Sequence, residues 1–264
     1  MVRSSALRTL AELSEEQWGL FTRRQAEATG MAWSTLARLS TGATMVERVA
    51  HGVYRVRGAP RADHLDLRAA WLQLAPDLPV WKRDAGTGVV THRSAAALYG
   101  LGHLPADVHE FVLPQRRQSR RPDVRLHRGR LRDGEWTLLG GLPVTRPSRI
   151  AADLLSDRED PEAVGYVISD ALRAGYDRPG QMAAALGSSA ARLGFHRGDG
   201  LSVVTWLLEL VGAPERRRWL AQARSTAAVP ARRADPVFGG ATRRLGAGRE
   251  RRPAPEPGPG EVST

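Results

Sequence analysis

The chain has 264 residues, of which 42% are hydrophobic, and a formal net charge of +11 at pH 7. This length allows two modest domains, and the absence of cysteine excludes disulfides and thiolate metal sites. No apolar run approaches the roughly 20 residues that span a bilayer, and the first residues lack the apolar core of a signal peptide. We therefore expect a cytoplasmic protein with no membrane partner.

The positive charge is concentrated near the two ends of the chain. Residues 1–57 carry a net charge of +3 and residues 213–264 carry +6, which leaves +2 for residues 58–212. Almost every cation is arginine, as is typical of a GC-rich genome, so codon usage explains part of the excess. The remaining positive charge favours a polyanionic partner such as nucleic acid. Residues 58–212 are nearly neutral and are therefore a poor binding surface for such a partner.

Two helices are predicted at the start of the chain. Apolar residues at helical spacing predict the first helix over residues 4–16. Thr22 and Gln25 have the spacing of a capping box, which begins a second helix over residues 22–29. Gly30 ends that helix, because glycine readily takes the left-handed conformation of a C-cap.

A third helix and a hairpin follow. Ser34 is the expected N-cap of a helix over residues 35–39. Two short β-branched runs, 45–49 and 53–56, are joined by a tight turn at residues 50–52 and predict a β-hairpin. Helix, helix, turn, helix and hairpin, in that order, are typical of a winged helix-turn-helix domain, which we assign to residues 1–57.

A helix-turn-helix reads DNA by placing its second helix in the major groove. Ser34, Thr35 and Arg38 are the expected base contacts, and Arg38 alone can recognise guanine in a bidentate manner. The start of the preceding helix and the hairpin would contact phosphate or the minor groove. Ordinary solvated residues are the alternative for each position. The predicted DNA-binding residues are Thr22, Arg23, Arg24, Ser34, Thr35, Arg38, Arg48, His51, Arg55 and Arg57.

The remainder predicts an α+β fold with a small mixed domain at 63–175, a helical extension at 176–212 and a disordered tail at 213–264. Arg, Ala, Gly and Pro dominate the tail, which lacks hydrophobic periodicity. The expected helices are 62–74, 94–99, 147–155, 163–174, 181–186 and 201–211. The expected strands are 80–81, 88–91, 111–113, 124–127, 136–139 and 142–145.

Several segments, in this order, resemble the AbiEi family, the antitoxins of type IV toxin–antitoxin systems. They are GLFTRRQAEATGMAWSTLARLSTGATMVERVAHGVYRVRG, VVTHRSAAALYGLGHLP, VRLHRG and GLPVTRPSRIAADLL, within roughly residues 15–175. The resemblance implies that the winged domain binds promoter DNA and represses its own operon. It also implies that the rest of the chain opposes a nucleotidyltransferase-like toxin.

The chain departs from many relatives of that family after about residue 190. Such relatives carry a nuclease-like domain, which needs an acidic cluster with a nearby lysine for metal-assisted hydrolysis. Residues 190–264 contain no lysine. Our hypothesis is that this segment is a truncated or frame-shifted remnant of such a domain.

Two catalytic or metal-binding constellations are disfavoured. His92, Ser94 and Asp107 could be combined into a hydrolase triad, but no nucleophile elbow is present and Ser94 is better explained as an N-cap. His103, His109 and Asp107 could be combined into a zinc site, but the histidines lack helical i, i+4 spacing. We therefore expect no catalytic residue, no metal and no cofactor.

Two arginine-rich segments remain. The loop at residues 115–122 could follow a phosphate backbone, meet an acidic partner or be merely solvated, and its arginines are Arg116, Arg117, Arg120 and Arg121. Arg146 and Arg149 stand at a helix start and could bind an anion. The simpler interpretation of Arg149 is an ion pair with Asp153 four residues later.

The leading hypothesis is a non-enzymatic DNA-binding autorepressor and antitoxin, with double-stranded DNA and a nucleotidyltransferase-like toxin as partners. One alternative is a protein-binding antitoxin without DNA readout, because a winged helix can also serve protein interaction. The other is a truncated relative of the nuclease-domain proteins.

Overall fold

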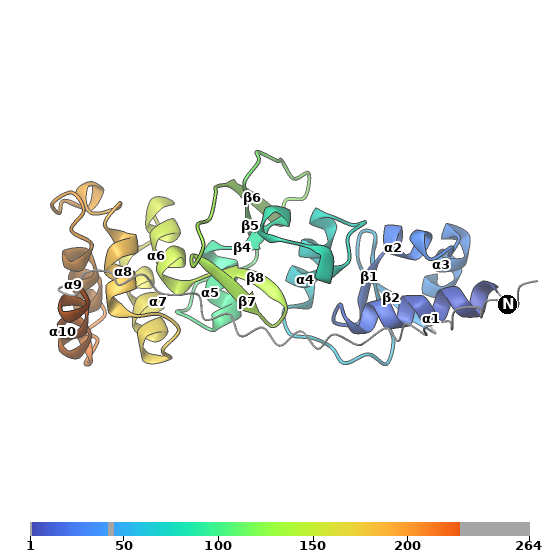
Figure 1. The fold of residues 1–264 in the computed structure, drawn as a ribbon, viewed down its shortest axis with the longest axis horizontal. Coiled ribbons are helices and arrows are strands. Elements are labelled where there is room, and N and C mark those ends of the chain that lie inside the picture. The colour runs from blue at the N-terminus through green and yellow to red at the C-terminus, as the bar shows by residue number, and fades with distance from the viewer. Residues whose placement is uncertain (1, 42–44, 228–264) are drawn as a thin grey trace, which may run out of the picture. The chain divides into compact units, whose positions relative to one another are not determined.

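The structure is a computed structural model that describes residues 2–41 and 45–227 (Figure 1). Helices occur along both ranges and strands lie between residues 20 and 145, so the predicted α+β class is confirmed. No helix in the described ranges has the length and apolar character needed to cross a membrane.

The first part, here called the winged unit, contains three helices and a three-stranded sheet. Its elements are α1 (Val2–Glu15), β1 (Leu20–Thr22), α2 (Arg23–Ala28), α3 (Trp33–Thr41), β2 (Val46–Ala50) and β3 (Val53–Val56). The sheet is antiparallel with strand order β1-β3-β2. The predicted order of helices and hairpin is confirmed, and β1 is a strand that the sequence pattern did not predict.

Local signals place the ends of the short helices. The Thr22 Oγ1 atom accepts a hydrogen bond from the Gln25 backbone at 3.1 Å, and the Gln25 side chain accepts one from the Thr22 backbone at 2.9 Å. The predicted capping box is therefore confirmed. Gly30 follows α2 with a φ of +86°, which favours glycine. Ser34 is not an N-cap, because α3 begins one residue earlier, at Trp33.

Helices α2 and α3 are too short to be stable alone and depend on a shared core. Leu10, Phe21, Ala26 and Leu36 are each at most 2% exposed and belong to one cluster. The Phe21 ring stacks on Tyr54, with centroids 5.7 Å apart. These contacts attach the helix-turn-helix to the sheet and hold α3 in place.

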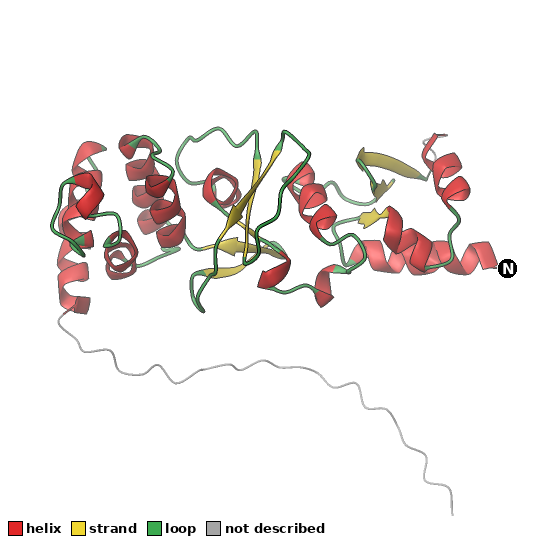
Figure 2. Ribbon diagram, turned by 90° about the horizontal axis from the view of Figure 1, so that it is seen from above, coloured by secondary structure: helices red, strands yellow, loops and turns green. Residues whose placement is uncertain are grey.

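The second part contains a five-stranded mixed sheet with the order β6-β5-β4-β8-β7. Its strands are β4 (Val89–Val90), β5 (His109–Leu113), β6 (Val124–Arg128), β7 (Trp136–Leu139) and β8 (Leu142–Thr145). Three helices accompany them: α4 (Leu65–Leu74), α5 (His92–Tyr99) and α6 (Pro147–Ser156). In Figure 2 these strands are bordered by helices, and the pairs β4–β8 and β5–β6 are parallel.

Four helices follow the sheet. They are α7 (Pro161–Arg173), α8 (Pro179–Leu186), α9 (Gly200–Leu210) and α10 (Arg216–Ala227). Gly200 lets α8 and α9 approach closely, because a Cβ atom there would collide with the Ala183 carbonyl oxygen. Side chains of all four helices join the large core that also contains the sheet.

Three sequence-based predictions for this part are wrong. Residues 80–81 were expected as a strand but lie in a 3₁₀ turn, Val80–Lys82, directly after Pro79. The helix expected to begin at Ser94 begins at His92 with Thr91 as its N-cap. The segment expected to be a disordered tail forms α10 up to residue 227, and residues 228–264, with the remnant hypothesis for them, lie outside the described residues.

The winged unit is attached to α4 and to the β7–β8 turn. The Trp18 indole N–H donates to the Gly140 carbonyl at 3.0 Å, and the Arg68 guanidinium lies 4.5 Å from the Trp18 ring centroid. The Trp71 ring meets Trp18 edge-on at 6.0 Å. Val53 of the hairpin is fully buried in the core that contains the larger sheet. The winged unit therefore packs directly on the second part.

Candidate nucleic-acid interface

The outer face of α3 presents polar side chains to solvent. Ser34 and Arg38 are exposed and Thr35 is half-buried, whereas Leu36, on the opposite face, is 1% exposed. Within the described residues, the Arg38 side chain makes no hydrogen bond and no ion pair. A guanidinium without an internal partner keeps all its donors available to a ligand. Arg38 thus has the position and freedom expected of a base-reading residue.

An arginine–tryptophan pair lies beside this face. The Arg23 guanidinium lies 4.3 Å from the Trp33 ring centroid, and its Nε donates to the Glu27 carboxylate at 2.7 Å. Trp33 is 44% exposed although it is a large hydrophobic residue. In the sequence, the only signal for Trp33 is an aromatic residue outside the apolar period of its helix. The cation–π contact therefore holds the Arg23 guanidinium beside the start of α3.

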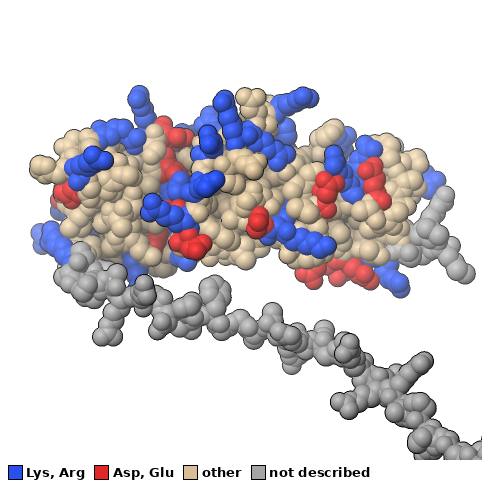
Figure 3. Space-filling model, turned by 45° about the horizontal axis from the view of Figure 1, so that its top comes forward, with Lys and Arg blue, Asp and Glu red and all other residues tan. Residues whose placement is uncertain are grey.

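A groove of about 770 Å³ lies between α2, the hairpin turn, α4 and the β5–β6 connection. Glu27 is the one acidic residue among those that line it. Its basic lining residues are Arg23, Arg24, His51, Arg117, Arg120 and Arg121. Figure 3 shows basic side chains gathered on the face that contains this connection. The loop whose role the sequence left open therefore lies beside the start of α2.

Several groove arginines are held by the protein itself. The Arg117 side chain donates to the Leu74 carbonyl at 2.6 Å, and Arg121 forms hydrogen bonds with Gln73 and Asp123. Arg24 forms an ion pair with Asp77 at 3.0 Å. These contacts position the guanidinium groups, and the Asp77 and Asp123 carboxylates offset part of the charge of Arg24 and Arg121.

Two predicted DNA contacts have internal roles instead. Thr22 is 1% exposed, and its hydroxyl accepts from the Gln25 backbone and donates to the Pro76 carbonyl. The Arg55 side chain is 14% exposed and donates to Glu47 at 2.6 Å, which lowers the pKa of Glu47. Because these donors and acceptors are already used inside the fold, we remove Thr22 and Arg55 from the interface.

The hairpin turn is anchored to its surroundings. The His51 carbonyl accepts from the Gln73 side chain at 2.6 Å, and the Gly52 carbonyl accepts from the Arg23 backbone at 2.8 Å. The Arg48 guanidinium lies 3.1 Å from the His51 ring nitrogen Nδ1. Arg57 is exposed, with Glu47 at 4.0 Å. This short wing is fixed against α4.

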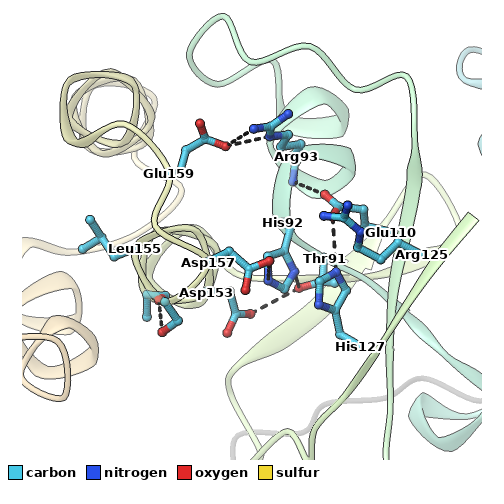
Figure 4. A network of polar contacts seen from close by, with 12 residues as sticks. Thr91, His92, Arg93, Glu110, Arg125, His127, Asp153, Leu155, Asp157 and Glu159 are labelled. Carbon is cyan, nitrogen blue, oxygen red and sulfur yellow. Dashed lines mark hydrogen bonds and ion pairs between the residues drawn. The ribbon is translucent and has the colours of Figure 1, made fainter. Parts of the chain in front are cut away.

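A second polar cluster was not anticipated as a unit. The His92 and His127 rings stack with centroids 3.8 Å apart, and His92 Nε2 lies 3.6 Å from an Asp157 oxygen (Figure 4). Burial lowers the pKa of His92, and the His127 ring lowers it further. Burial raises the pKa of Glu110, but its hydrogen bond with His127 and its neighbours bring it below the ordinary value.

Ser94, a member of the disfavoured hydrolase constellation, has a structural role. The Ser94 hydroxyl donates to the Val108 carbonyl and accepts from the Glu110 backbone, each at 2.9 Å, so it joins α5 to β5. His103 and Asp107 are exposed. The predicted ion pair between Arg149 and Asp153 is confirmed at 2.8 Å.

Comparison with known proteins assigns neither a family nor a function to the chain. No protein-family model matches the chain, and no curated protein matches it. The function is therefore inferred from the geometry described above and from the family resemblance of the sequence segments.

Proposed function

We propose that this protein is a DNA-binding transcriptional regulator that inserts α3 into the major groove. The observation that carries the proposal is the exposed face of α3, on which Arg38 has no internal partner among the described residues. The winged arrangement supports it, because α3 follows α2 after a short turn and its inner face is fixed by Leu36.

Different residues would have different roles at the DNA. Arg38 would donate two hydrogen bonds to guanine, and Ser34 and Thr35 would contact neighbouring base edges. Arg23 and Arg24, in the first turn of α2, would contact phosphates. Arg48, His51 and Arg57 of the hairpin would add charge near the backbone and no base readout, since the hairpin turn is held against α4.

We further propose that the protein is a cytoplasmic antitoxin that controls its own operon and opposes a nucleotidyltransferase-like toxin. This role rests on the resemblance of its segments to the AbiEi family. The fold is compatible with this role, because the winged unit and the second part share one hydrophobic core. In this role the chain would act by binding DNA and the toxin and would catalyse no reaction.

The test is DNA binding to the region upstream of the protein's own gene, measured by fluorescence anisotropy over a series of salt concentrations. We expect Arg38→Ala to weaken binding to that DNA by roughly 10- to 100-fold, the equivalent of one lost bidentate base contact. Binding to random DNA should change little, because phosphate contacts are retained.

Arg130→Ala is the matched control, since Arg130 is exposed, makes no ion pair or side-chain hydrogen bond in the described ranges and lies outside the winged unit. It should bind like the wild type. If Arg38→Ala retains full site preference, base readout by α3 is wrong. If the wild type shows no preference for the upstream region but captures the adjacent toxin, the protein-binding antitoxin replaces the regulator.

A further inference from the structure

His92, His127 and Asp157 converge from three elements. His92 begins α5, His127 lies on β6 and Asp157 directly follows α6. One potential ligand atom from each of the three residues lies within 4.8 Å of the other two. Figure 4 shows the two stacked rings with the Asp157 carboxylate beside His92. Long-range folding alone brings these residues together, because at least 30 residues separate each from the next along the chain.

The hydrogen bonds of His92 fix which of its nitrogens carries the proton. The Thr91 hydroxyl lies 3.2 Å from the Asp153 carboxylate, which is an acceptor only, so the hydroxyl proton points to Asp153. The same hydroxyl oxygen lies 3.1 Å from His92 Nδ1 and must therefore accept a proton from it. In the neutral ring, Nε2 then carries the free lone pair, and it is the atom 3.6 Å from Asp157.

The His127 ring is likewise oriented by an acceptor, the Glu110 carboxylate. Its Nε2 lies 3.2 Å from the Glu110 carboxylate, which also accepts the Arg93 backbone N–H at 3.0 Å. Glu110 is 4% exposed and has the Arg125 guanidinium 3.7 Å away. As an acceptor, this carboxylate directs the Nε2 proton toward itself and leaves the lone pair of a neutral His127 on Nδ1.

Both rings thus have one nitrogen oriented by an outer acceptor and one nitrogen free. This is the arrangement in which metal-binding histidines are found, with the second nitrogen donating to a carboxylate or another oxygen. A His92 lone pair opposite the Asp157 carboxylate, 3.6 Å away, is repulsive, and either a proton on Nε2 or a metal ion between the two groups would remove that repulsion. A pocket of about 290 Å³ adjoins the cluster and gives access from solvent, and the Asp157 side chain is 47% exposed.

We propose that His92, His127 and Asp157 form a site for one divalent transition-metal ion, of which Zn²⁺ is the best match. Two imidazole nitrogens and one carboxylate oxygen are typical zinc ligands, whereas Ca²⁺ and Mg²⁺ prefer oxygen alone. Closure around a tetrahedral ion, with bonds of about 2.0–2.1 Å, requires rotation of the exposed Asp157 side chain and of the His127 ring. The fourth position faces the pocket, where water can occupy it.

The bound ion would join α5, β6 and the end of α6. Thr91 and Asp153 on one side, and Glu110 on the other, are positioning residues that act through the two histidines. The site lies outside the winged unit and shares no residue with the proposed DNA interface, so it stands or falls independently of DNA binding.

The test uses the full chain, produced without a histidine tag and stripped with EDTA. Zn²⁺ is titrated by calorimetry and Co²⁺ by its visible d–d absorption. We expect uptake of one ion per chain, an absorption intensity typical of tetrahedral Co²⁺, and a rise in Tm with Zn²⁺. His127→Gln keeps a donor to Glu110 but removes a ligand, and it should weaken Zn²⁺ binding by more than about 100-fold.

Further variants separate a specific site from surface binding. Asp157→Asn should weaken Zn²⁺ binding similarly, and Glu110→Gln by about 10- to 100-fold, the range of an outer-shell partner. His103→Gln is the matched control, because His103 is exposed and is not a member of the cluster. The proposal is overturned if the wild type takes up no Zn²⁺ at micromolar concentrations. Circular dichroism shows whether the His127→Gln and Asp157→Asn variants are folded. The proposal is also overturned if both variants are folded and still take up Zn²⁺.

Discussion

At the residue scale, arginines of the same charge have opposite roles in this protein. Arg38 is free among the described residues, whereas Arg83 is almost entirely used by the backbone. Its guanidinium donates to the carbonyls of Trp71, Leu72 and Ala75 at 2.6–2.9 Å, and it lies 4.5 Å from the Trp71 ring centroid. Burial lowers the pKa of Arg83 to about 10, so the group remains charged at neutral pH. Arg83 thus satisfies the carbonyls at the end of α4.

We predict that Arg83→Ala lowers the free energy of unfolding by about 2–4 kcal/mol, since it leaves several carbonyls without their donor. Urea denaturation followed by circular dichroism measures the change. Arg130→Ala, an exposed control, should stay within about 0.5 kcal/mol of the wild type. Equal stability of the two variants would contradict the capping role of Arg83.

The half-buried His109 makes stability depend on pH. Burial lowers the pKa of His109 below its ordinary value of 6.5, and Arg121 lowers it as well, while Asp123 and Asp66 oppose them. The unfolded chain therefore binds more protons than the folded chain once the pH falls below 6.5. The stabilising effect is complete above that pH and is lost as acidification continues toward the folded pKa.

We expect the free energy of unfolding to fall between about pH 7 and pH 5, and to fall less in His109→Gln, which cannot titrate. Denaturation of both proteins across this range, in EDTA, provides the measurement. Parallel pH profiles for the two proteins would show that His109 contributes nothing.

At the element scale, α10 is the clearest departure from the sequence analysis. Trp219, Leu220 and Ala223 are each at most 8% exposed, and Trp219 and Leu220 belong to the large core. Their spacing is helical, but the many arginines around them obscured the apolar face. Four of the residues in Arg216–Ala227 are arginine, so composition favoured disorder while three apolar positions determined packing.

We predict that Trp219→Ala lowers the free energy of unfolding by about 3–5 kcal/mol, as expected for a buried aromatic residue. Trp81→Ala is the control, since Trp81 is 56% exposed and should cost less than about 0.5 kcal/mol. Thermal and urea denaturation of both variants test this. If residues 213–227 were disordered, as the composition suggested, the two substitutions would be equally harmless.

At the scale of the whole molecule, the winged unit is packed on the second part by specific contacts. Trp18 reaches Gly140, Gln25 donates to the Leu78 carbonyl at 3.1 Å, and the Val80 backbone donates to Gln17 at 3.0 Å. Val53 lies in the large core. A flexible linker between two independent domains would leave such groups without partners. The orientation of α3 is therefore coupled to the second part.

We expect residues 2–227 to unfold in one cooperative transition. Tryptophan fluorescence and far-ultraviolet circular dichroism should give the same urea midpoint, and amides of β3 should exchange with the same free energy as amides of β8. A separate, earlier transition of the winged unit would contradict this coupling. Trp18→Ala, which removes the contact with Gly140, is the variant expected to separate the two transitions.

Much of the fold could be predicted from local pattern. The capping box at Thr22, the hairpin, and the strands at 136–139 and 142–145 all follow from signals within a few residues, and the structure has them at those places. The interface was only partly predictable. Residue type and helical spacing selected Arg38, but the same reasoning selected Thr22 and Arg55, whose burial depends on residues distant in sequence.

The sequence by itself determined the order of elements, the winged helix-turn-helix pattern and the exposed face of α3, because helix caps, turns and hydrophobic periodicity act over short distances. Only the tertiary structure decided which arginines are free and which are bound to carbonyls or carboxylates. It also decided that the Arg117–Arg121 segment lies beside α2, and that His92, His127 and Asp157 meet. These depend on sheet register and helix packing, which join residues far apart in the chain and have no local signature.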